Sequence, residues 1–200
     1  MTRGRDPDHF SRRAKQEGHA ARSIYKLEEI DQRWKLLKKG QRVLDLGCSP
    51  GSWMQYAVTK VGPSGRVLGI DLKPVNATFP PHAEARVGDI YKLDQATLGD
   101  PYDVVLSDMA PSTMGDHTTD ALRSAALAEQ AIAIADAFVK PSGSMVVKVL
   151  EGGEIQNLVV LMRRIFEKVE RLRPQATRQR STEIFLVGLG RKAKAKDATS

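Results

Sequence analysis

An apolar run that ends in an acidic residue and breaks into a glycine-bounded loop constrains this chain more than any other feature. The run and the loop cover residues 43–53, with Asp45 as the acidic residue and Gly47 and Gly51 as the glycines. A helix-compatible segment, 53–61, follows at once. Strand, glycine loop and helix in this order open the nucleotide-binding folds, where the loop and the helix N-terminus receive the ligand. The sequence therefore predicts a nucleotide-cofactor site in the N-terminal part of the chain.

The spacing of the two glycines selects the kind of cofactor. A dinucleotide site carries Gly-x-Gly-x-x-Gly, which lets backbone amides reach a pyrophosphate. Here the pattern is Gly47-x-x-x-Gly51, and Asp45 stands where its carboxylate would repel a pyrophosphate. That carboxylate suits a cationic amino-acid group, which S-adenosylmethionine has in addition to its sulfonium. The loop therefore favours S-adenosylmethionine over NAD, and Asp45 is a candidate to hold the methionyl ammonium, directly or through water.

The rest of the chain alternates between strand and helix patterns, and its 200 residues suit one domain with a substantial core. The expected strands are 41–46, 65–72, 85–88, 102–107, 143–150, 169–172 and 184–189, and the expected helices after the loop are 53–61, 118–139 and 155–166. This alternation predicts an α/β, Rossmann-like fold: a mostly parallel, doubly wound sheet closed by an antiparallel strand. Within the single domain 1–200, we expect residues 1–37 to form a basic helical extension of one or two helices. Thr118 or Thr119 is expected to cap the helix 118–139, and 191–200 to be a mobile basic tail.

The formal net charge of +7 is concentrated in two basic clusters. The first comprises Arg3, Arg5, Arg12, Arg13, Lys15 and Arg22, and the second Arg163, Arg164, Lys168, Arg171, Arg173, Arg178 and Arg180. Such clusters suit the phosphate backbone of RNA, although for charge alone a solvated surface is the better explanation. No apolar run approaches the roughly 18 residues of a membrane span, and the first residues lack the apolar core of a signal peptide. We therefore expect a cytoplasmic protein that makes no membrane contact.

Polar residues stand at the carboxyl ends of four expected strands. Asp71 ends the second, Asp89 follows the third, Asp108 follows the fourth and Lys148 lies in the fifth. Because ligands of doubly wound sheets bind beyond these ends, we expect the four side chains to face one crevice. Lys148 is the most unusual, since its strand is otherwise apolar on both faces and lysine is rarely buried without a partner. It is either an edge-strand lysine that extends to water or a lysine of the cleft paired with Asp108.

In this context, four residues resemble a known catalytic set. Lys26, Asp108, Lys148 and Glu183 are similar to the Lys-Asp-Lys-Glu tetrad of ribose 2′-O-methyltransferases, and the match is with the FtsJ/RrmJ (RlmE) group. They stand within Arg-Ser-Ile-Tyr-Lys-Leu (22–27), Ser-Asp-Met-Ala-Pro (107–111), Val-Lys-Val (147–149) and Arg-Ser-Thr-Glu (180–183). The resemblance runs from residue 9 to residue 188. The chain departs from residues more usual in the group at Cys48, Ser49, Ser52, Ser112 and Phe185, none of them in the tetrad.

The resemblance implies a class I S-adenosylmethionine-dependent methyltransferase fold and the methylation of a uridine ribose in 23S ribosomal RNA of the large ribosomal subunit. It implies that the four residues of the tetrad are catalytic. It also implies that Gly51 and Trp53 contact the cofactor, with Asp71 on its ribose and Asp89 on its adenine. Asp108 would face both the cofactor and the acceptor.

A ribose hydroxyl is a poor nucleophile at neutral pH, so a base must take its proton as it attacks. An amine takes a proton only when it is uncharged. Burial and a second cation favour the uncharged form, whereas a nearby carboxylate favours the charged one. We expect Lys148 to be the general base and Asp108 to orient it near the sulfonium. Lys26 and Glu183 are expected to position the ribose and adjust Lys148.

Several other interpretations remain or are set aside. Transfer RNA or an mRNA cap is an alternative acceptor, and a non-catalytic RNA-binding ribosome assembly factor is an alternative to an enzyme. The only cysteine, Cys48, lies in the cofactor loop, so we do not expect it to be the nucleophile of a cytosine methylase. His9, His19, His82 and His117 have no spacing that builds a metal site, so no metal is expected. A monomer is expected.

Overall fold

The computed structural model describes residues 7–112, 114–177 and 181–193. Four arginines of the two basic clusters, Arg3, Arg5, Arg178 and Arg180, lie outside the described residues, as does the part of the expected tail from 194 to 200. Among the described helices, none is both long and apolar enough to cross a membrane.

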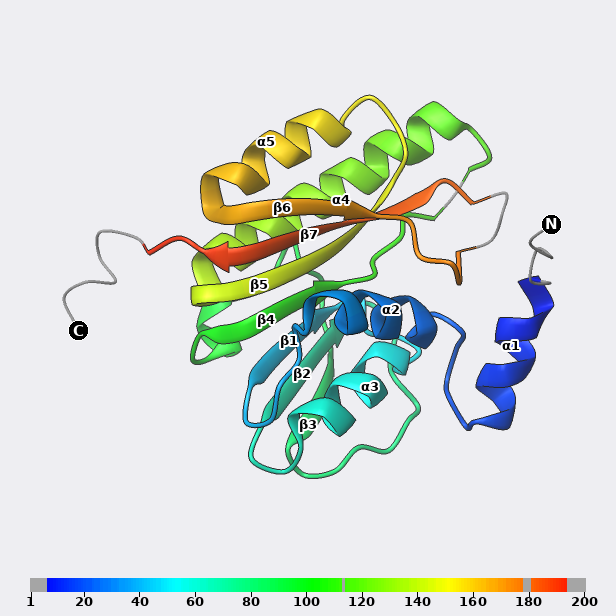
Figure 1. Ribbon diagram of the computed structural model, residues 1–200, viewed down its shortest axis with the longest axis vertical. Helices are drawn as coiled ribbons and strands as arrows, with labels where there is room; N and C mark the ends of the chain where they lie inside the picture. Colours follow the sequence, from blue (N-terminus) through cyan, green and yellow to red (C-terminus); the bar gives the residue numbers. More distant parts are fainter. Residues whose placement is uncertain (1–6, 113, 178–180, 194–200) are drawn as a thin grey trace.

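Within the described part of the chain, one seven-stranded sheet has the order β3-β2-β1-β4-β5-β7-β6 (Figure 1). Its strands are β1 Arg42–Leu46, β2 Arg66–Asp71, β3 Ala83–Val87, β4 Tyr102–Ser107, β5 Val139–Leu150, β6 Phe166–Leu172 and β7 Glu183–Arg191. β7 is antiparallel to β5 and β6, and the other neighbouring strands are parallel. The expected doubly wound α/β fold with an antiparallel closing strand is confirmed.

Helices cover both faces of the sheet (Figure 1). They are α1 Pro7–Gln16, α2 Ile24–Trp34, α3 Ser52–Val61, α4 His117–Phe138 and α5 Ile155–Ile165, with a 3-10 turn, η1, at Gln95–Leu98. Successive residues of a strand face opposite sides, so β5 contributes to two cores. Val147 and Val149 pack with residues of α4 and α5, whereas Val146 packs with residues of α2 and α3. The sheet is thus buried on both faces, which explains the nearly continuous apolar runs of its central strands.

Several boundaries differ from the sequence-based expectation. β3 begins at Ala83 rather than at residue 85, and β6 begins at Phe166 rather than at residue 169. β5 begins at Val139 rather than at residue 143, because a register shift against β4 accommodates the Pro-Ser-Gly break within the strand. The N-cap of α4 is Asp116 and neither threonine, since an Asp116 carboxylate oxygen accepts a hydrogen bond from the Thr119 amide at 2.6 Å. The missed cap moves the start of α4 by one residue.

The C-terminal segment also differs from the expected tail at its beginning. Arg191 is buried and ends β7, and the amide of Lys192 donates to the carbonyl oxygen of Ile165 at 2.9 Å. Lys192 Nζ donates to the carbonyl oxygen of Arg163 at 2.7 Å. The sheet therefore continues to Arg191, and ordered hydrogen bonds continue to Lys192.

Packing between the two ends of the chain places the N-terminal helices against the β6–β7 connection. Ala14, Ile24, Tyr25 and Ala176 form a small buried cluster of their own. The amide of Gln175 donates to Glu29 Oε2 at 2.7 Å. Segments more than 140 residues apart in sequence thus meet at the carboxyl ends of the strands.

Candidate active site

A cavity of 580 Å³ lies at the carboxyl ends of β1, β2 and β4. The strand order reverses between β1 and β4, which is where doubly wound sheets bind ligands. Its wall includes Asp71, Asp89 and Asp108. Three of the residues expected at the cofactor are therefore brought to one cavity. Gly51 and Trp53 are not on this wall, and their expected cofactor contacts stay predictions.

A close approach of two loops shapes this cavity. Gly47 has a φ of +80°, and a Cβ on it would lie 3.0 Å from both the backbone nitrogen and the Cα of Met109. Both residues line the cavity, Gly47 from the β1–α3 loop and Met109 from the β4–α4 loop. Glycine is required here for its backbone conformation and for the space, so the glycine motif keeps the two loops in contact.

Turn amides orient the two carboxylates on the β2 and β3 side of the cavity. Asp71 accepts hydrogen bonds from the Ser49 amide at 2.9 Å and from the Lys73 amide at 2.8 Å. Asp89 Oδ1 accepts from the Tyr91 amide at 3.0 Å. A carboxylate oxygen has more than one acceptor direction, so both groups keep the capacity to accept from hydroxyl or amino groups of a ligand.

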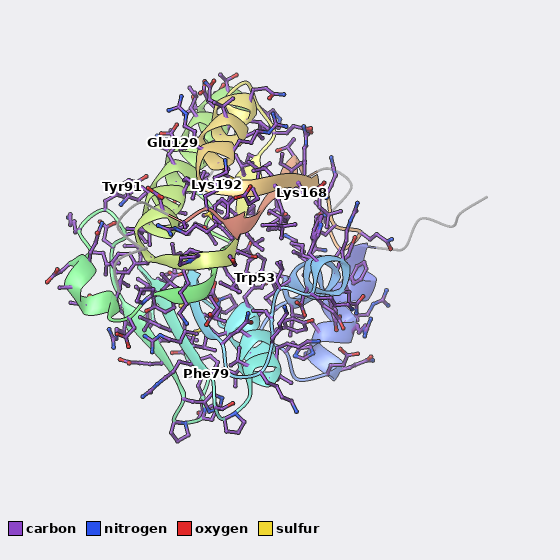
Figure 2. The ribbon with its side chains drawn as sticks, turned by 60° about the vertical axis from the view of Figure 1, so that its left-hand side comes forward. Trp53, Phe79, Tyr91, Glu129, Lys168 and Lys192 are labelled. Carbon is purple, nitrogen blue, oxygen red and sulfur yellow. The ribbon has the colours of Figure 1, made fainter. Side chains whose placement is uncertain are left out.

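The Trp53 side chain connects α3 to α2. It is buried in the interior near the sheet, whereas Tyr91 lies at the surface beside α4 (Figure 2). Trp53 Nε1 donates to the carbonyl oxygen of Ser23 at 2.9 Å, and its ring lies 5.8 Å from that of Phe185. The indole therefore fixes the start of α2, three residues before Lys26.

Buried carboxylate oxygens without partners surround the glycine loop. Asp45 is fully buried, and neither of its carboxylate oxygens has a hydrogen-bond partner among the described residues. Burial raises its pKa well above the ordinary value, and the nearby charges of Asp108 and Asp71 raise it further. A cationic ligand would relieve this concentration of acidic groups. These acidic groups therefore suit a ligand that carries a sulfonium and an ammonium.

Lys148 lies on a central strand and not at a sheet edge, and unlike the three aspartates it is not on the cavity wall. β5 is flanked by β4 and β7, so the edge-strand interpretation is wrong. The Lys148 side chain is 5% exposed, and its Nζ donates to the carbonyl oxygen of Asp108 at 2.7 Å. Nζ also lies 3.0 Å from Asp108 Oδ1; this contact is an ion pair rather than a hydrogen bond, because Oδ1 has no hydrogen-bond donor. The expected Lys148–Asp108 pair is present.

Lys26 and Glu183 form a second pair beside the first. Lys26 Nζ donates to Glu183 Oε2 at 2.5 Å, with side chains 7% and 21% exposed. Burial acts to raise the pKa of Glu183, but the charges of Lys26 and Lys148 outweigh it and the net pKa is lowered. In the β5–β7 register, Glu183 is opposite Leu150, and Leu150 comes two residues after Lys148 in β5. The fold thus assembles all four tetrad residues, from α2, the end of β4, β5 and β7.

Sequence reasoning missed the contacts that hold α2 in place. Asp31 of α2 is buried, and it accepts from the Leu37 amide and from the Tyr56 hydroxyl, each at 2.9 Å. Lys60 Nζ is 3.6 Å from the same carboxylate. Asp31 lies in a strongly charged helix, and no local pattern distinguishes it from an exposed aspartate.

The described residues of the second basic cluster do not lie together. β6 begins beside the end of β7, so Arg163, Arg164 and Lys168 lie at the end of the sheet opposite Glu183. Figure 1 shows this junction of α5 with β6 on the side away from α1. Arg171 and Arg173, at and after the end of β6, lie at the same end of the sheet as Glu183. The second cluster is therefore divided between the two ends.

Comparisons with known proteins agree with this geometry. Residues 20–191 match the family model of FtsJ-like methyltransferases. The ribosomal RNA large subunit methyltransferase E of Desulfatibacillum aliphaticivorans is 47% identical over 188 residues, which cover 92% of this chain and 91% of that protein. A putative ribosomal RNA methyltransferase from Plasmodium falciparum has a similar structure, with a TM-score of 0.75 and 27% identity over 88% of this chain and 100% of its own. Human methyltransferase-like protein 13, solved with SAH, shares the fold, with a TM-score of 0.62 and 13% identity over 87% of each chain.

Proposed function

This chain belongs to the family of FtsJ-like methyltransferases, and on that basis we propose that it methylates a ribose 2′-hydroxyl of large-subunit ribosomal RNA. The observation that carries the proposal is the assembly of the two lysine–carboxylate pairs beside the 580 Å³ cavity. Binding alone does not require a buried lysine on a central strand, whereas proton removal from a hydroxyl does require a base.

The residues around the cavity suit S-adenosylmethionine. When bound, this cofactor supplies a methyl group that its sulfonium makes electrophilic. Asp71 and Asp89 would hold the nucleoside part by accepting from hydroxyl and amino groups. Asp45 is fully buried and is not on the cavity wall, so it would attract the methionyl ammonium by its charge rather than by direct contact. Asp108 lies on the cavity wall and pairs with Lys148, so it connects the cofactor site to the acceptor site.

Lys148 is the residue that accepts the proton of the 2′-hydroxyl. Its Nζ is held by the carbonyl oxygen and the carboxylate of Asp108, which fixes the direction of the amine and stabilises the ammonium once it has formed. Its burial keeps water from competing for the proton. Proton abstraction by a positioned base typically contributes about 10²–10⁴-fold, and alignment of the reacting groups contributes much of the rest.

The Lys26–Glu183 pair positions the acceptor. Glu183 stays ionised because its pKa is lowered, so it accepts hydrogen bonds and balances the positive charge of Lys26 and Lys148. Lys26 Nζ also lies 5.8 Å from the centre of the Phe185 ring, which limits its freedom. Together the two residues offer one donor and one acceptor to a ribose.

Basic residues at the same end of the sheet are suited to the RNA backbone. Arg12, Arg13 and Lys15 lie on α1, and Arg171 and Arg173 lie at the β6–β7 connection that packs against α1 and α2. Cations on two segments beside one site favour a phosphate chain that crosses it. The relative in Desulfatibacillum is named for the large-subunit ribosomal RNA, which supports that acceptor over transfer RNA or an mRNA cap.

The test is methyl transfer from labelled S-adenosylmethionine to large ribosomal subunits, free ribosomal RNA and transfer RNA, followed by mapping of the modified nucleotide. Lys148→Ala should lower the rate by at least about 10²-fold with unchanged cofactor affinity. Lys140→Ala is the matched control, because Lys140 is on the same strand but pairs with Asp103 at its other end. Label on transfer RNA alone would contradict ribosomal RNA as the acceptor. No label on any RNA, despite bound cofactor, would indicate an RNA-binding protein without this activity.

A further inference from the structure

A second cavity, of 320 Å³, lies between the first turns of α4 and the connection from β5 to α5. Its wall includes His117, Ala121, Leu122, Leu150, Glu151 and Glu154. None of the residues that line the first cavity is among those that line this one. It is therefore a separate site, to which the reaction described above assigns no role.

This second cavity begins next to the tetrad. Leu150 is paired with Glu183 in the sheet register, and the amide of Glu151 donates to the carbonyl oxygen of Thr182 at 2.8 Å. Leu150 follows Lys148 by two residues, which is about 7 Å along a strand. A ribose placed at Lys148 and Glu183 would thus have this cavity as its neighbour.

The walls of the second cavity are apolar, with carboxylates beside them. Ala121 and Leu150 contribute apolar surface, and Leu122 is 53% exposed. A Cβ on Gly152 would lie 2.8 Å from the Ala121 Cβ, so glycine lets the connection approach α4 closely. These are the surfaces that a flat, largely apolar ring requires.

The polar groups of the second cavity are hydrogen-bond acceptors, which suit the N–H groups of a base. Glu151 and Glu154 place two carboxylates on its wall; Glu151 is paired with Arg171, and Glu154 Oε2 accepts from Asn157 Nδ2 at 2.9 Å. Carboxylates accept hydrogen bonds from the N–H groups on the edges of nucleobases, as they do from cytosine amino groups in DNA recognition. Of the cations suited to phosphates, Arg12, Arg13 and Lys15 lie on α1, whereas Arg171 of β6 lies beside the cavity as the partner of Glu151.

We propose that the second cavity binds the base of the nucleotide whose ribose is methylated. The carbon that carries the base is bonded directly to the carbon that carries the 2′-hydroxyl, so a base in this cavity brings the hydroxyl to the tetrad. This inference rests on the proposed function, because it requires an RNA acceptor at Lys148. It assigns Ala121 and Leu122 to acceptor binding, and it requires the nucleotide to leave any base stack before reaction.

The test compares the native acceptor with an abasic one. The mapped nucleotide is replaced in the ribosomal RNA by an abasic ribose that keeps its 2′-hydroxyl. Wild-type protein is measured beside Ala121→Trp, which fills the cavity, and Leu122→Ala, which removes part of its exposed wall. Val160→Trp and Val160→Ala are the controls, since Val160 is an apolar residue of α5, 49% exposed, outside both cavities.

With the native base, Ala121→Trp should lower kcat/KM by about tenfold or more. Leu122→Ala should lower it less, and both variants should keep wild-type affinity for S-adenosylmethionine. The wild type should lose activity on the abasic acceptor, and neither cavity variant should add to that loss, because interacting groups are not additive. Ala121→Trp with wild-type kcat/KM on the native base, or with the same fold loss on both acceptors, overturns the proposal. Wild-type protein that methylates no RNA refutes instead the proposed function.

Discussion

The Lys26–Glu183 pair allows a quantitative test of how the site is held together. In the variant Glu183→Gln, the side chain keeps its shape and loses its charge. Lys26 is only 7% exposed, and in this variant it loses the carboxylate at 2.5 Å. The unfavourable desolvation free energy of its buried ammonium is then no longer offset by an ion pair. We therefore expect a less stable protein as well as a less active one.

The magnitude follows from the geometry. A hydrogen bond to a charged group contributes about 1.5–3 kcal/mol to the free energy of unfolding. For a protein of this size, each kcal/mol shifts Tm by about 2–4 °C, so the variant should melt roughly 3–12 °C lower at pH 7. Thermal unfolding followed by circular dichroism measures this shift.

The pH dependence gives the test a direction. The pKa of Glu183 is lowered below 4.5, its ordinary value, so its contribution is fully present above about pH 4.5 and is lost as the pH falls through the folded-state pKa. The gap in Tm between wild type and variant should therefore be constant at neutral pH and should narrow in acid.

Glu84→Gln is the matched control for this experiment. Glu84 Oε1 lies 2.7 Å from Arg86 Nε, but the two side chains are 60% and 43% exposed, so the loss should be about 0–1 kcal/mol. In the double variant Lys26→Met/Glu183→Gln, the destabilisation should be smaller than the sum of the two single ones. The reasoning is refuted if Glu183→Gln melts with the wild type at neutral pH, or if the two substitutions are additive.

Three further predictions concern the glycine loop. Gly47→Ala should destabilise the protein by about 1–3 kcal/mol and weaken cofactor binding, because φ is positive and a Cβ would lie 3.0 Å from the Met109 backbone. Urea unfolding measures the stability and calorimetric titration measures the cofactor affinity. An unchanged affinity would contradict the prediction. Asp45→Asn should weaken cofactor binding. The folded-state pKa of Asp45 is raised, so the free energy of unfolding of the wild type should decline as the pH rises from about 3.8 toward that pKa. Urea unfolding at several pH values should show this decline for the wild type and not for the variant. Burial raises the pKa of the Cys48 thiol, so iodoacetamide at pH 8 should react with it only after the protein is unfolded. Mass spectrometry detects the added group.

Much of the fold is written in local patterns. The apolar runs of the central strands and the glycines that end β1 predict the strands, the helices and their alternation, because burial on both faces and backbone conformation act within a few residues. Local patterns failed where an alternative of similar energy existed nearby. Asp116 competed with Thr118 and Thr119 as the cap of α4, and a register shift carried β5 through Pro141.

The candidate site shows more clearly what the sequence predicts and what only the tertiary structure decides. The resemblance identified the tetrad residues, and the alternation of strands predicted that Asp71, Asp89 and Asp108 face one crevice, which is where the cavity lies. The sequence left open whether Lys148 is an edge lysine, because an edge strand and a central strand have the same local pattern. Only the order of the strands, with β5 between β4 and β7, decided it.

The sequence by itself determined the fold class, the cofactor loop and the family resemblance, because these depend on residue types at short spacing. The tertiary structure decided which charges share a site. It joined Lys26 to Glu183 across 157 positions, buried Asp45 without a hydrogen-bond partner in the described part of the chain, and divided the second basic cluster between the two ends of the sheet. Electrostatic energy depends on distance and burial in three dimensions, and neither is a property of the order of residues along the chain.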